Sequence, residues 1–555
     1  MMVGNEAGEA GSSHHGRRET VLGLRLRWWM LGACALHVVL GALLYEPILF
    51  PGGDNAGYMI LGEALGSGQG YRDLYLPETP LHATYPPFYP TVLAVLGWLG
   101  GVQLFKVASL ALTTAAVGLT GILAVRWMGG RSAVLLAGLV ALNPVLLDYG
   151  HWVLSEALFV ALVLACLVAL EGIGVGDRSH DDVRPERRLF VLGLAAASAA
   201  FLTRTAGLPL LIAVALWPAL ERWPRRLVGA ALVAALTAGG WALYQQIAAP
   251  GEPGYLGQLL LIDPYEPEAG RTDVAGLFVR GMENLWQYVS AVLPGSLGLE
   301  ASGRGAGPAS LVTGVLVTGL SLAGWVGRAR DRLGPSELFV FFYVGLIAVW
   351  PSVWTDRRFL LPVLPLLLLY AALGVGRMSA RLAGATDGGA RWIGAGALVG
   401  VLALFGVVDT AGKVPERFGC QMAYATGEPC ISPAYRSFYA AARWTGENTP
   451  ADAVVSNRKP RLFFLHARRR GFVYPYTSEP ELLLRELERR GADHVVLDAV
   501  SGTTARYLVP AVQENASRFE VLYREGEPAT WVLRFRPSPE TALRELEDRG
   551  DGRGP

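Results

Sequence analysis

One aspartate lies where an apolar stretch gives way to a polar, glycine-rich one. Asp54 is part of the run PGGDNAG at residues 51–57. A carboxylate at an apolar boundary can act as a general base on a hydroxyl group, because such a setting raises its pKa, and it can also hold a divalent metal. Asp-Asn before an apolar run is equally an ordinary helix start, with the aspartate as N-cap. The residue types alone leave these interpretations open.

Charged groups also flank the apolar stretches near residues 148–156 and near residue 204. A short turn, Asp-Tyr-Gly-His, ends at His151, and Glu156 follows at the start of the next apolar run. Arg204 is the charge in the turn Leu-Thr-Arg-Thr between two later apolar runs. Ionisable side chains within a membrane are costly, so they need a partner or a function. Glu156 can pair with Arg204, either as a buried ion pair that orients helices or, with His151, as part of a substrate contact.

Two adjacent arginines precede another apolar run. Arg357 and Arg358 come directly before Phe-Leu-Leu-Pro-Val-Leu-Pro. Guanidinium groups offer paired donors to phosphate oxygens, so two arginines at an outer membrane boundary suit a lipid phosphate. Arginines at this depth also reach toward the polar interface without any ligand. In another polar stretch, Arg280, Asn284 and Tyr288 fall on one expected helical face, which either lines a cavity or lies on the membrane.

The run Tyr-Pro-Pro-Phe-Tyr-Pro at residues 85–90 gives shape rather than reactivity. Each proline fixes its own φ and restrains the residue before it. We therefore expect this run, which begins with Tyr85, to form an extended entrance to a site. Glu78 and His82 lie just upstream and could ligate a metal, although their spacing matches no tight metal-binding pattern.

The elements that must position these residues are apolar helices. Hydrophobic residues make up 52% of the chain before glycine is counted, and charged residues make up 17%. Soluble domains have roughly 45–50% apolar residues with glycine included, and about 25% charged residues. The charges form short clusters between apolar runs of about 15 to 24 residues, which is typical of membrane spans. A net charge of +1 offers no basic surface, which excludes nucleic acid as a partner.

We expect an α-helical polytopic membrane protein with about eleven transmembrane helices. The first runs from Trp28 to about Phe50, is too long for a signal-peptide core and has no cleavage site. The later apolar segments are 103–126, 133–147, 152–171, 189–203, 206–219, 227–246, 309–327, 337–353, 359–376 and 392–411. Arginine-rich clusters fall in alternate connections, and such clusters stay on the cytoplasmic side. This places the N-terminus in the cytoplasm and makes 91–99 a half-embedded helix on the outer side.

The same threading predicts the domain organisation. A cytoplasmic tail (1–27) precedes a transmembrane domain (28–411) that carries large outer loops at 51–102 and 247–308. An extracytoplasmic domain (412–555) follows. Most of the polar, non-repetitive sequence lies in these outer regions, and loops on a helical scaffold commonly carry function.

The C-terminal domain has the pattern of a small α/β domain. Helices are expected at 433–448 and 479–490, and strand-like runs at 453–455, 461–466, 472–474 and 494–497, followed by a hairpin formed by 520–524 and 530–534. The second helix is amphipathic, with its leucines on one side at Leu482, Leu483, Leu484 and Leu487.

The cysteines divide into two pairs by position. Cys34 and Cys166 lie in expected spans, where a cysteine serves as a small apolar residue. Cys420 and Cys430 bracket a short loop in the outer compartment, where disulfides form and persist. We expect these two to form a structural disulfide.

Several of these motifs, taken in order, resemble one family. An aspartate soon after the first helix is followed by Tyr-Pro-Pro-Phe-Tyr-Pro, Ser-Glu-Ala-Leu-Phe, Leu-Thr-Arg-Thr and Arg-Phe-Leu-Leu-Pro-Val-Leu-Pro. This order resembles the GT-C superfamily of membrane glycosyltransferases, which includes the protein O-mannosyltransferases and the bacterial aminoarabinose transferases. The resemblance covers residues 28 to 376. The first loop lacks the Asp-x-Asp pair of the superfamily and has no lysine near its paired prolines.

The resemblance implies a function and a set of roles. A sugar would move, with inversion, from a polyprenyl-phosphate donor to a lipid, glycan or protein acceptor at the outer face of a bacterial plasma membrane. Asp54 would be the base, and Arg204, Arg357 and Arg358 would hold the lipid phosphate as it leaves, with a divalent metal as a candidate cofactor. The rival interpretation is a non-enzymatic transporter of lipid-linked saccharides or a membrane scaffold. A transporter should have polar residues along a path through the bilayer, whereas here they gather at one face.

Overall fold

The computed structural model describes residues 9–173, 184–251, 255–265, 269–299, 307–382, 388–428 and 430–538. The chain forms two compact units. The helical unit comprises Met1–Glu46, Ala83–Tyr89 and Val102–Gly419, and the α/β unit comprises Pro47–His82, Pro90–Gly101 and Cys420–Pro555. Residues 1–8 of the expected cytoplasmic tail and residues 539–555 of the expected C-terminal domain lie outside the described residues.

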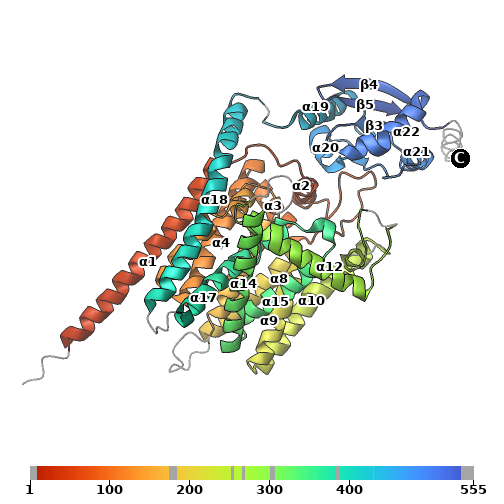
Figure 1. Ribbon diagram of the computed structural model, residues 1–555. Coiled ribbons are helices and arrows are strands. Elements are labelled where there is room, and N and C mark those ends of the chain that lie inside the picture. The colour runs from red at the N-terminus through yellow and green to blue at the C-terminus, as the bar shows by residue number, and fades with distance from the viewer. Residues whose placement is uncertain are drawn as a thin grey trace, which may run out of the picture. The chain divides into compact units, whose positions relative to one another are not determined.

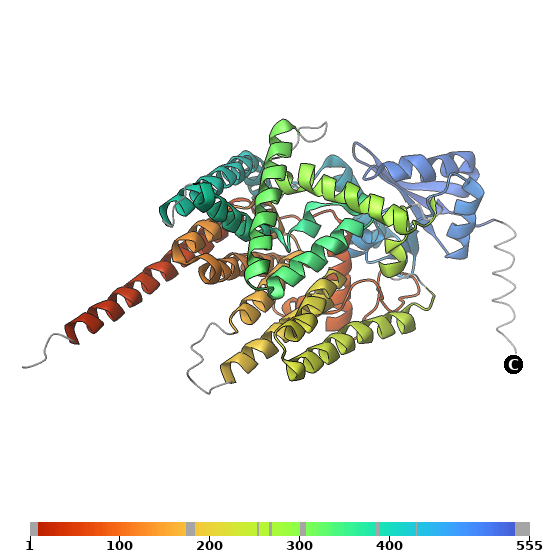
Figure 2. The ribbon, with the colours of Figure 1, turned by 60° about the horizontal axis from the view of Figure 1, so that its bottom comes forward.

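The helical unit has a helix at every apolar segment expected from the sequence (Figures 1 and 2). Its longer helices are α1 (Glu9–Leu43), α4 (Val102–Met128), α5 (Gly130–Ala141), α7 (Glu156–Glu171), α8 (Arg184–Thr203), α9 (Leu208–Leu220), α10 (Pro224–Ala248), α12 (Val274–Gln287), α14 (Pro308–Asp331), α15 (Pro335–Val349), α17 (Leu364–Leu382) and α18 (Gly388–Ala425). Short helices connect them: α6 (Pro144–Tyr149), α11 (Tyr255–Leu259), α13 (Leu293–Ser296) and α16 (Arg357–Leu360). The first helix starts earlier than expected, at Glu9. It also ends earlier, because the helical backbone stops at Leu43 although the apolar run continues beyond it.

Close helix packing in this unit depends on glycine. A Cβ atom added to Gly324 of α14 would lie 1.9 Å from the carbonyl oxygen of Tyr370 in α17. A Cβ atom on Gly374 of α17 would lie 2.1 Å from the Leu320 carbonyl oxygen of α14. Small residues let helix backbones approach in this way, which favours association where water does not drive it.

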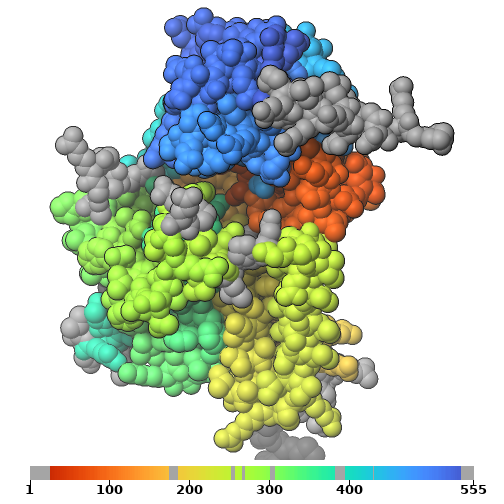
Figure 3. All heavy atoms as spheres, turned by 90° about the vertical axis from the view of Figure 1, so that its right-hand side faces the viewer, coloured from red at the N-terminus to blue at the C-terminus, as the bar shows by residue number. Residues whose placement is uncertain are grey.

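Among the described residues, five helices are long and apolar enough to cross a membrane: Arg25–Leu43, Val102–Met128, Pro224–Ala248, Pro308–Asp331 and Gly394–Ala425. Shorter apolar helices accompany them, so the count of about eleven spans stays a prediction. Helix α10, yellow in Figure 3, has an exposed apolar surface of the kind expected of a membrane span. Its exposed side chains include Val228, Leu232, Leu236, Leu243 and Ile247.

The α/β unit is built on a sheet with strand order β2-β1-β3-β5-β4. Its strands are β1 (Val454–Ser456), β2 (Arg470–Phe472), β3 (His494–Leu497), β4 (Phe519–Glu525) and β5 (Thr530–Phe535). β1 pairs in parallel with β2 and β3, while β5 runs antiparallel to β3 and β4. The expected hairpin therefore forms at the sheet edge, and β3 has the predicted bounds.

Helices complete this unit: α2 (Gly53–Gly66), α3 (Phe88–Gly97), α19 (Pro433–Asn448), α20 (Pro460–Ala467), α21 (Pro480–Arg489) and α22 (Val509–Glu514). Two expectations were wrong. The run 461–466 is helix α20 rather than a strand, because Pro460 occupies the first helical turn and the short apolar run fits either period. Leu482 is 47% exposed, so only Leu483, Leu484 and Leu487 of α21 face the core.

The N-terminal segment of the α/β unit packs into its core. Ala56 of α2 is fully buried in a cluster with Phe438, Val455 and Val496, which come from α19, β1 and β3. Further along α2, Ile60 and Ala64 pack against Phe464 of α20. The start of α2 is thereby fixed against the sheet that follows much later in the sequence. The structure thus groups residues 47–82 with the C-terminal domain. The division between the two compact units falls at Cys420, later than the boundary at 412 expected from hydropathy.

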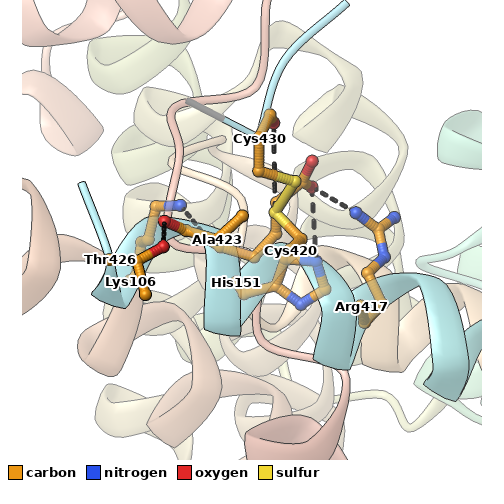
Figure 4. Close-up of a disulfide and its surroundings, with 8 residues drawn as sticks. Lys106, His151, Arg417, Cys420, Ala423, Thr426 and Cys430 are labelled. Atoms are coloured by element: carbon orange, nitrogen blue, oxygen red, sulfur yellow. Dashed lines mark hydrogen bonds and ion pairs between the residues drawn. A yellow bond between two sulfur atoms is a disulfide. The ribbon is translucent and has the colours of Figure 1, made fainter. Parts of the chain in front are cut away.

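The expected disulfide is present. Cys420 and Cys430 are bonded in the α/β unit (Figure 4). Cys166 is a free, buried cysteine and Cys34 is a free, half-buried one, in keeping with their expected roles as apolar residues.

Candidate functional site

Asp54 lies in the first turn of α2, in the α/β unit. The N-cap of this helix is Gly52, which has no side-chain cap, so the interpretation of Asp54 as N-cap is wrong. Asp54 is half-buried, and the neighbouring Asn55 donates its side-chain N–H to the Phe50 carbonyl at 2.5 Å. A negative charge in the first turn is favoured by the helix dipole. Local structure therefore holds a carboxylate at a defined place on this unit.

Two cations that the sequence reasoning missed, Arg458 and Lys459, lie on the same unit as Asp54. Asn457 turns the chain as it leaves β1, because its side-chain oxygen accepts from the Lys459 backbone N–H at 3.0 Å. Lys459 then donates its ammonium to the Pro51 carbonyl at 3.4 Å. Burial and the nearby Arg458 charge lower the pKa of Lys459, while the Asp498 and Asp54 carboxylates oppose that change. An ammonium group is thus held within electrostatic range of Asp54.

In the helical unit, the predicted pairing of Glu156 with Arg204 is confirmed. Arg204 donates to Glu156 Oε1 at 2.6 Å and to the Ser155 hydroxyl at 3.0 Å. The Glu156 side chain is 2% exposed and that of Arg204 is 16% exposed. Glu156 Oε2 is buried and has no hydrogen-bond partner among the described residues. This ion pair both joins α7 to the turn before α9 and presents a guanidinium at the end of these helices.

A phenyl ring brings a second arginine to the same place. The Arg204 guanidinium carbon lies 5.9 Å from the centre of the Phe359 ring, and that of Arg358 lies 4.9 Å from it. Asp356 caps the short helix α16 by accepting from the Arg357 backbone N–H at 2.5 Å. This cap fixes the start of the helix that carries Arg357 and Arg358. The Phe359 ring thus has two guanidinium groups near it, and guanidinium groups suit phosphate oxygens.

Arg357 faces a different element of the helical unit. A Cβ atom added to Gly295 of α13 would lie 3.3 Å from Arg357 Nε, so the arginine packs against that helix. The structure therefore joins Arg204, Glu156 and Arg358 around Phe359, and places Arg357 beside α13.

His151 belongs to a separate cluster of the helical unit. His151 is 2% exposed, and its Nε2 lies 3.9 Å from Glu46 Oε2. The same carboxylate oxygen accepts from Arg417 at 2.8 Å, and the Lys106 ammonium donates to the Glu46 carbonyl at 2.5 Å (Figure 4). Sequence reasoning missed this cluster, because its members lie far apart in the sequence. The geometry favours a buried charge network for His151 over a place beside Glu156.

The remaining candidates lie in loops. Tyr85 is half-buried in the segment before α3, which α10 anchors through a bond from Gln245 to the Ala83 carbonyl at 2.8 Å. His82 pairs with Asp73 at 2.9 Å, within the loop of the α/β unit, rather than with Glu78. Within the ranges that the structure describes, no group of three or more His, Cys, Asp or Glu side chains could hold a metal ion.

Arg280 and Asn284 lie on one buried face of α12, and Tyr288, the C-cap residue that begins the next helical turn, is buried as well. Arg280 donates to the carbonyls of Leu259 and Leu261 at 2.8 and 2.7 Å. Asn284 donates to the Ala348 and Trp350 carbonyls, at 2.7 Å each. This face holds neighbouring backbone in place, so it does not lie on the membrane.

The sequence matches no protein-family model and no curated protein. Solved structures do match. The aminoarabinose transferase ArnT from Cupriavidus metallidurans, in the apo state, is 16% identical over 91% of this chain and 98% of its own, with a TM-score of 0.56. The same protein bound to undecaprenyl phosphate matches with 13% identity, the same coverage and a TM-score of 0.56.

An archaeal protein matches as well. The oligosaccharyltransferase AglB from Archaeoglobus fulgidus, in complex with an inhibitory peptide and a dolichol-phosphate, is 14% identical over 93% of this chain and 75% of its own, with a TM-score of 0.54. Another structure of that oligosaccharyltransferase, a complex with Zn and sulfate, has a TM-score of 0.52 and 16% identity over 84% of this chain and 67% of its own. The chain thus shares the fold of the ArnT and AglB structures.

Proposed function

We propose that this protein is a multi-pass membrane glycosyltransferase that moves a sugar from a polyprenyl-phosphate donor to an acceptor hydroxyl on the extracytoplasmic face. The observation that carries the proposal is the pair of guanidinium groups, Arg204 and Arg358, on the Phe359 ring. The fold supports it, because the matching ArnT and AglB structures contain undecaprenyl phosphate and dolichol-phosphate. A cationic pair at the end of apolar helices suits such a lipid phosphate.

The proposed reaction assigns each charged group one role. The acceptor oxygen attacks the anomeric carbon while the bond from that carbon to the phosphate oxygen breaks, which inverts the configuration. Asp54 takes the proton from the acceptor hydroxyl, and the polyprenyl phosphate leaves with the electron pair of the broken bond. Arg204 and Arg358 stabilise the charge that grows on the phosphate as it leaves. Glu156 holds Arg204 in place through the 2.6 Å ion pair.

The test is sugar transfer from a radiolabelled polyprenyl-phosphate sugar pool into membrane and envelope fractions at matched expression. Asp54→Asn should lower transfer by about 10²- to 10⁴-fold, the usual contribution of a general base. Asp452→Asn, the same change at an exposed position of the same unit, should leave transfer unchanged. Equal transfer by wild type and Asp54→Asn would remove Asp54 from the chemistry.

The phosphate site has its own variant. Arg358→Gln should lower transfer by about 10²- to 10³-fold, the range seen when one electrostatic donor to a transition state is lost. The exposed Arg330 offers the matched change Arg330→Gln, which should keep wild-type transfer. A wild-type rate for Arg358→Gln would show that the guanidinium pair does not hold the leaving phosphate.

A divalent metal is tested in the same assay. Treatment with EDTA, followed by return of Mg²⁺, Mn²⁺ or Zn²⁺, separates a metal role of Asp54 from a base role. Transfer that survives EDTA supports the base, because a carboxylate that only held a metal would lose its effect with the ion.

The alternative function, transport of lipid-linked saccharides, gives a different result. A transporter would move a fluorescent lipid-linked sugar across a vesicle membrane without forming a glycosidic product. Absence of transfer together with such movement would favour the transporter.

A further inference from the structure

The parallel part of the α/β sheet has a topological switch point. The chain leaves β1 for β2 on one side and then returns past β1 to form β3 on the other, giving the order β2-β1-β3. In open α/β sheets, ligands bind outside the carboxyl ends of the strands at such a point. Here that edge lies between the ends of β1 and β3.

Buried polar atoms at this edge have no partner. Ser456, the last residue of β1, is fully buried, and Asp498, the first residue after β3, is 7% exposed. Within the described part of the chain, Ser456 Oγ, Asp498 Oδ2 and Arg458 Nε are buried atoms that make no hydrogen bond. Leaving such atoms unpaired is costly, so proteins usually pair them or use them for a ligand.

The local structure holds these groups in fixed positions. Asp498 Oδ1 accepts from the Val500 backbone N–H at 3.1 Å and from the Thr504 hydroxyl at 3.2 Å, which leaves Oδ2 for a ligand. The Tyr474 hydroxyl in turn contacts that of Thr504 at 2.8 Å. The Arg458 guanidinium carbon lies 5.3 Å from the centre of the Tyr476 ring. All three parallel strands thus contribute to the edge, since Tyr474 and Tyr476 follow β2.

The charges and donors indicate the class of ligand. Arg458 and Lys459 are balanced by Asp498 and by Asp54, so the edge has no excess positive charge for an anion. The unpaired atoms comprise a carboxylate acceptor, an N–H donor and a hydroxyl that does both. Sugar hydroxyls are themselves both donors and acceptors, and tyrosine rings offer them an apolar surface.

We propose that the carboxyl edge of β1 and β3 is a saccharide-binding site, in which Asp498, Ser456 and Arg458 bind sugar hydroxyls on the same unit as Asp54. The inference rests on the proposed function, and it adds a carbohydrate subsite to it. The sugar comes either from a glycan acceptor or from the head of the lipid-linked donor.

Binding is measured without transfer, on the full-length protein in lipid nanodiscs. The probes are methyl glycosides of common hexoses and pentoses, followed by saturation-transfer NMR up to about 50 mM. At least one glycoside should bind, and Asp498→Ala and Arg458→Gln should each weaken its binding by about tenfold or more. Asp452→Ala, at the opposite end of β1, should bind as wild type does. Arg458 is only half-buried, so its variant provides the test even where Asp498→Ala does not fold.

The outcomes separate the two proposals. Glycoside binding by wild type and Asp54→Asn, with no sugar transfer by either protein, supports the subsite and counts against the proposed enzyme. Transfer without any glycoside binding overturns the subsite alone, as do equal affinities in wild type and Arg458→Gln, or binding of inorganic phosphate in place of the glycosides. Preloading with a polyprenyl-phosphate sugar distinguishes the sources: displacement of the glycoside assigns the site to the donor, and simultaneous binding assigns it to the acceptor.

Discussion

Replacing Asp498 by asparagine should stabilise the α/β unit at neutral pH and leave its stability near pH 4 almost unchanged. The carboxyl is 7% exposed, and one of its oxygens has no hydrogen-bond partner among the described residues. Burial raises the pKa of Asp498 from 3.8 to about 6, despite bonds from Val500 and Thr504 and the charge of Arg458. Asparagine keeps an oxygen for those bonds and removes the charge.

The sign and size follow from the two pKa values. The folded state binds the proton more tightly than the unfolded state, so this contribution to stability is complete below about pH 4. It is lost as the pH rises from 3.8 to about 6. A difference of about two pKa units corresponds to about 3 kcal/mol. The free energy of opening should therefore be up to about 3 kcal/mol higher in Asp498→Asn than in wild type at pH 7.5.

Hydrogen exchange of β1 and β3 amides in the full-length protein measures this free energy locally. Rates are taken from pH 4 to 8 and corrected for intrinsic exchange. His466 titrates in part of this range, because burial and the Arg443 charge lower its pKa to about 4. Its contribution has the opposite sign, with stability rising as the pH rises, and it cancels in the difference between variant and wild type. Parallel profiles for the two proteins would refute this prediction.

Other perturbations test the packing of each unit. Cys420→Ser opens a loop whose ends are ten residues apart. This should lower the free energy of unfolding by about 2–3 kcal/mol and speed hydrogen exchange in the loop and at the start of α19. Gly324→Ala adds a methyl group 1.9 Å from a carbonyl oxygen of α17, so its Tm should fall by several degrees, whereas Gly319→Ala meets nothing within 4 Å and should keep the wild-type Tm. Arg328→Met leaves two carboxylates, which Arg328 binds at 2.7 Å each, without their cation. This should lower the free energy of unfolding by about 3–5 kcal/mol and lower the Tm, whereas Arg330→Met, at an exposed position, should keep the wild-type Tm.

The sequence was a good guide to elements with strong local signals. Apolar length alone located the helices at the expected spans, although it missed α11, α12 and α13, which lie in the expected outer loop 247–308. The bounds of α19 and β3 were predicted to the residue. Local signals failed where a short apolar run fits both the helical and the strand period. The run 461–466 is helical because Pro460 begins a turn there, and that proline was the available signal.

Of the candidate site, the sequence predicted the contact between one pair of residues but not the arrangement of the whole. A buried carboxylate needs a cation, so Glu156 and Arg204 could be paired from their positions in apolar sequence alone. Hydropathy does not show which helix ends meet, so the place of Arg358 on the same phenyl ring as Arg204 could not be foreseen. For the same reason His151 was grouped with Glu156, whereas it lies with Glu46.

The grouping of Asp54 with the C-terminal domain has a physical cause that sequence spacing hides. Ala56, two residues after Asp54, is fully buried among core residues of α19, β1 and β3, so α2 is a structural part of that unit. The strand order that puts Lys459 near Asp54 follows from sheet pairing, which a single sequence does not reveal. A change in the packing of β1 should therefore shift the carboxylate of Asp54 as well. Loss of the C-terminal domain would remove the support of the proposed base, so it would lower activity.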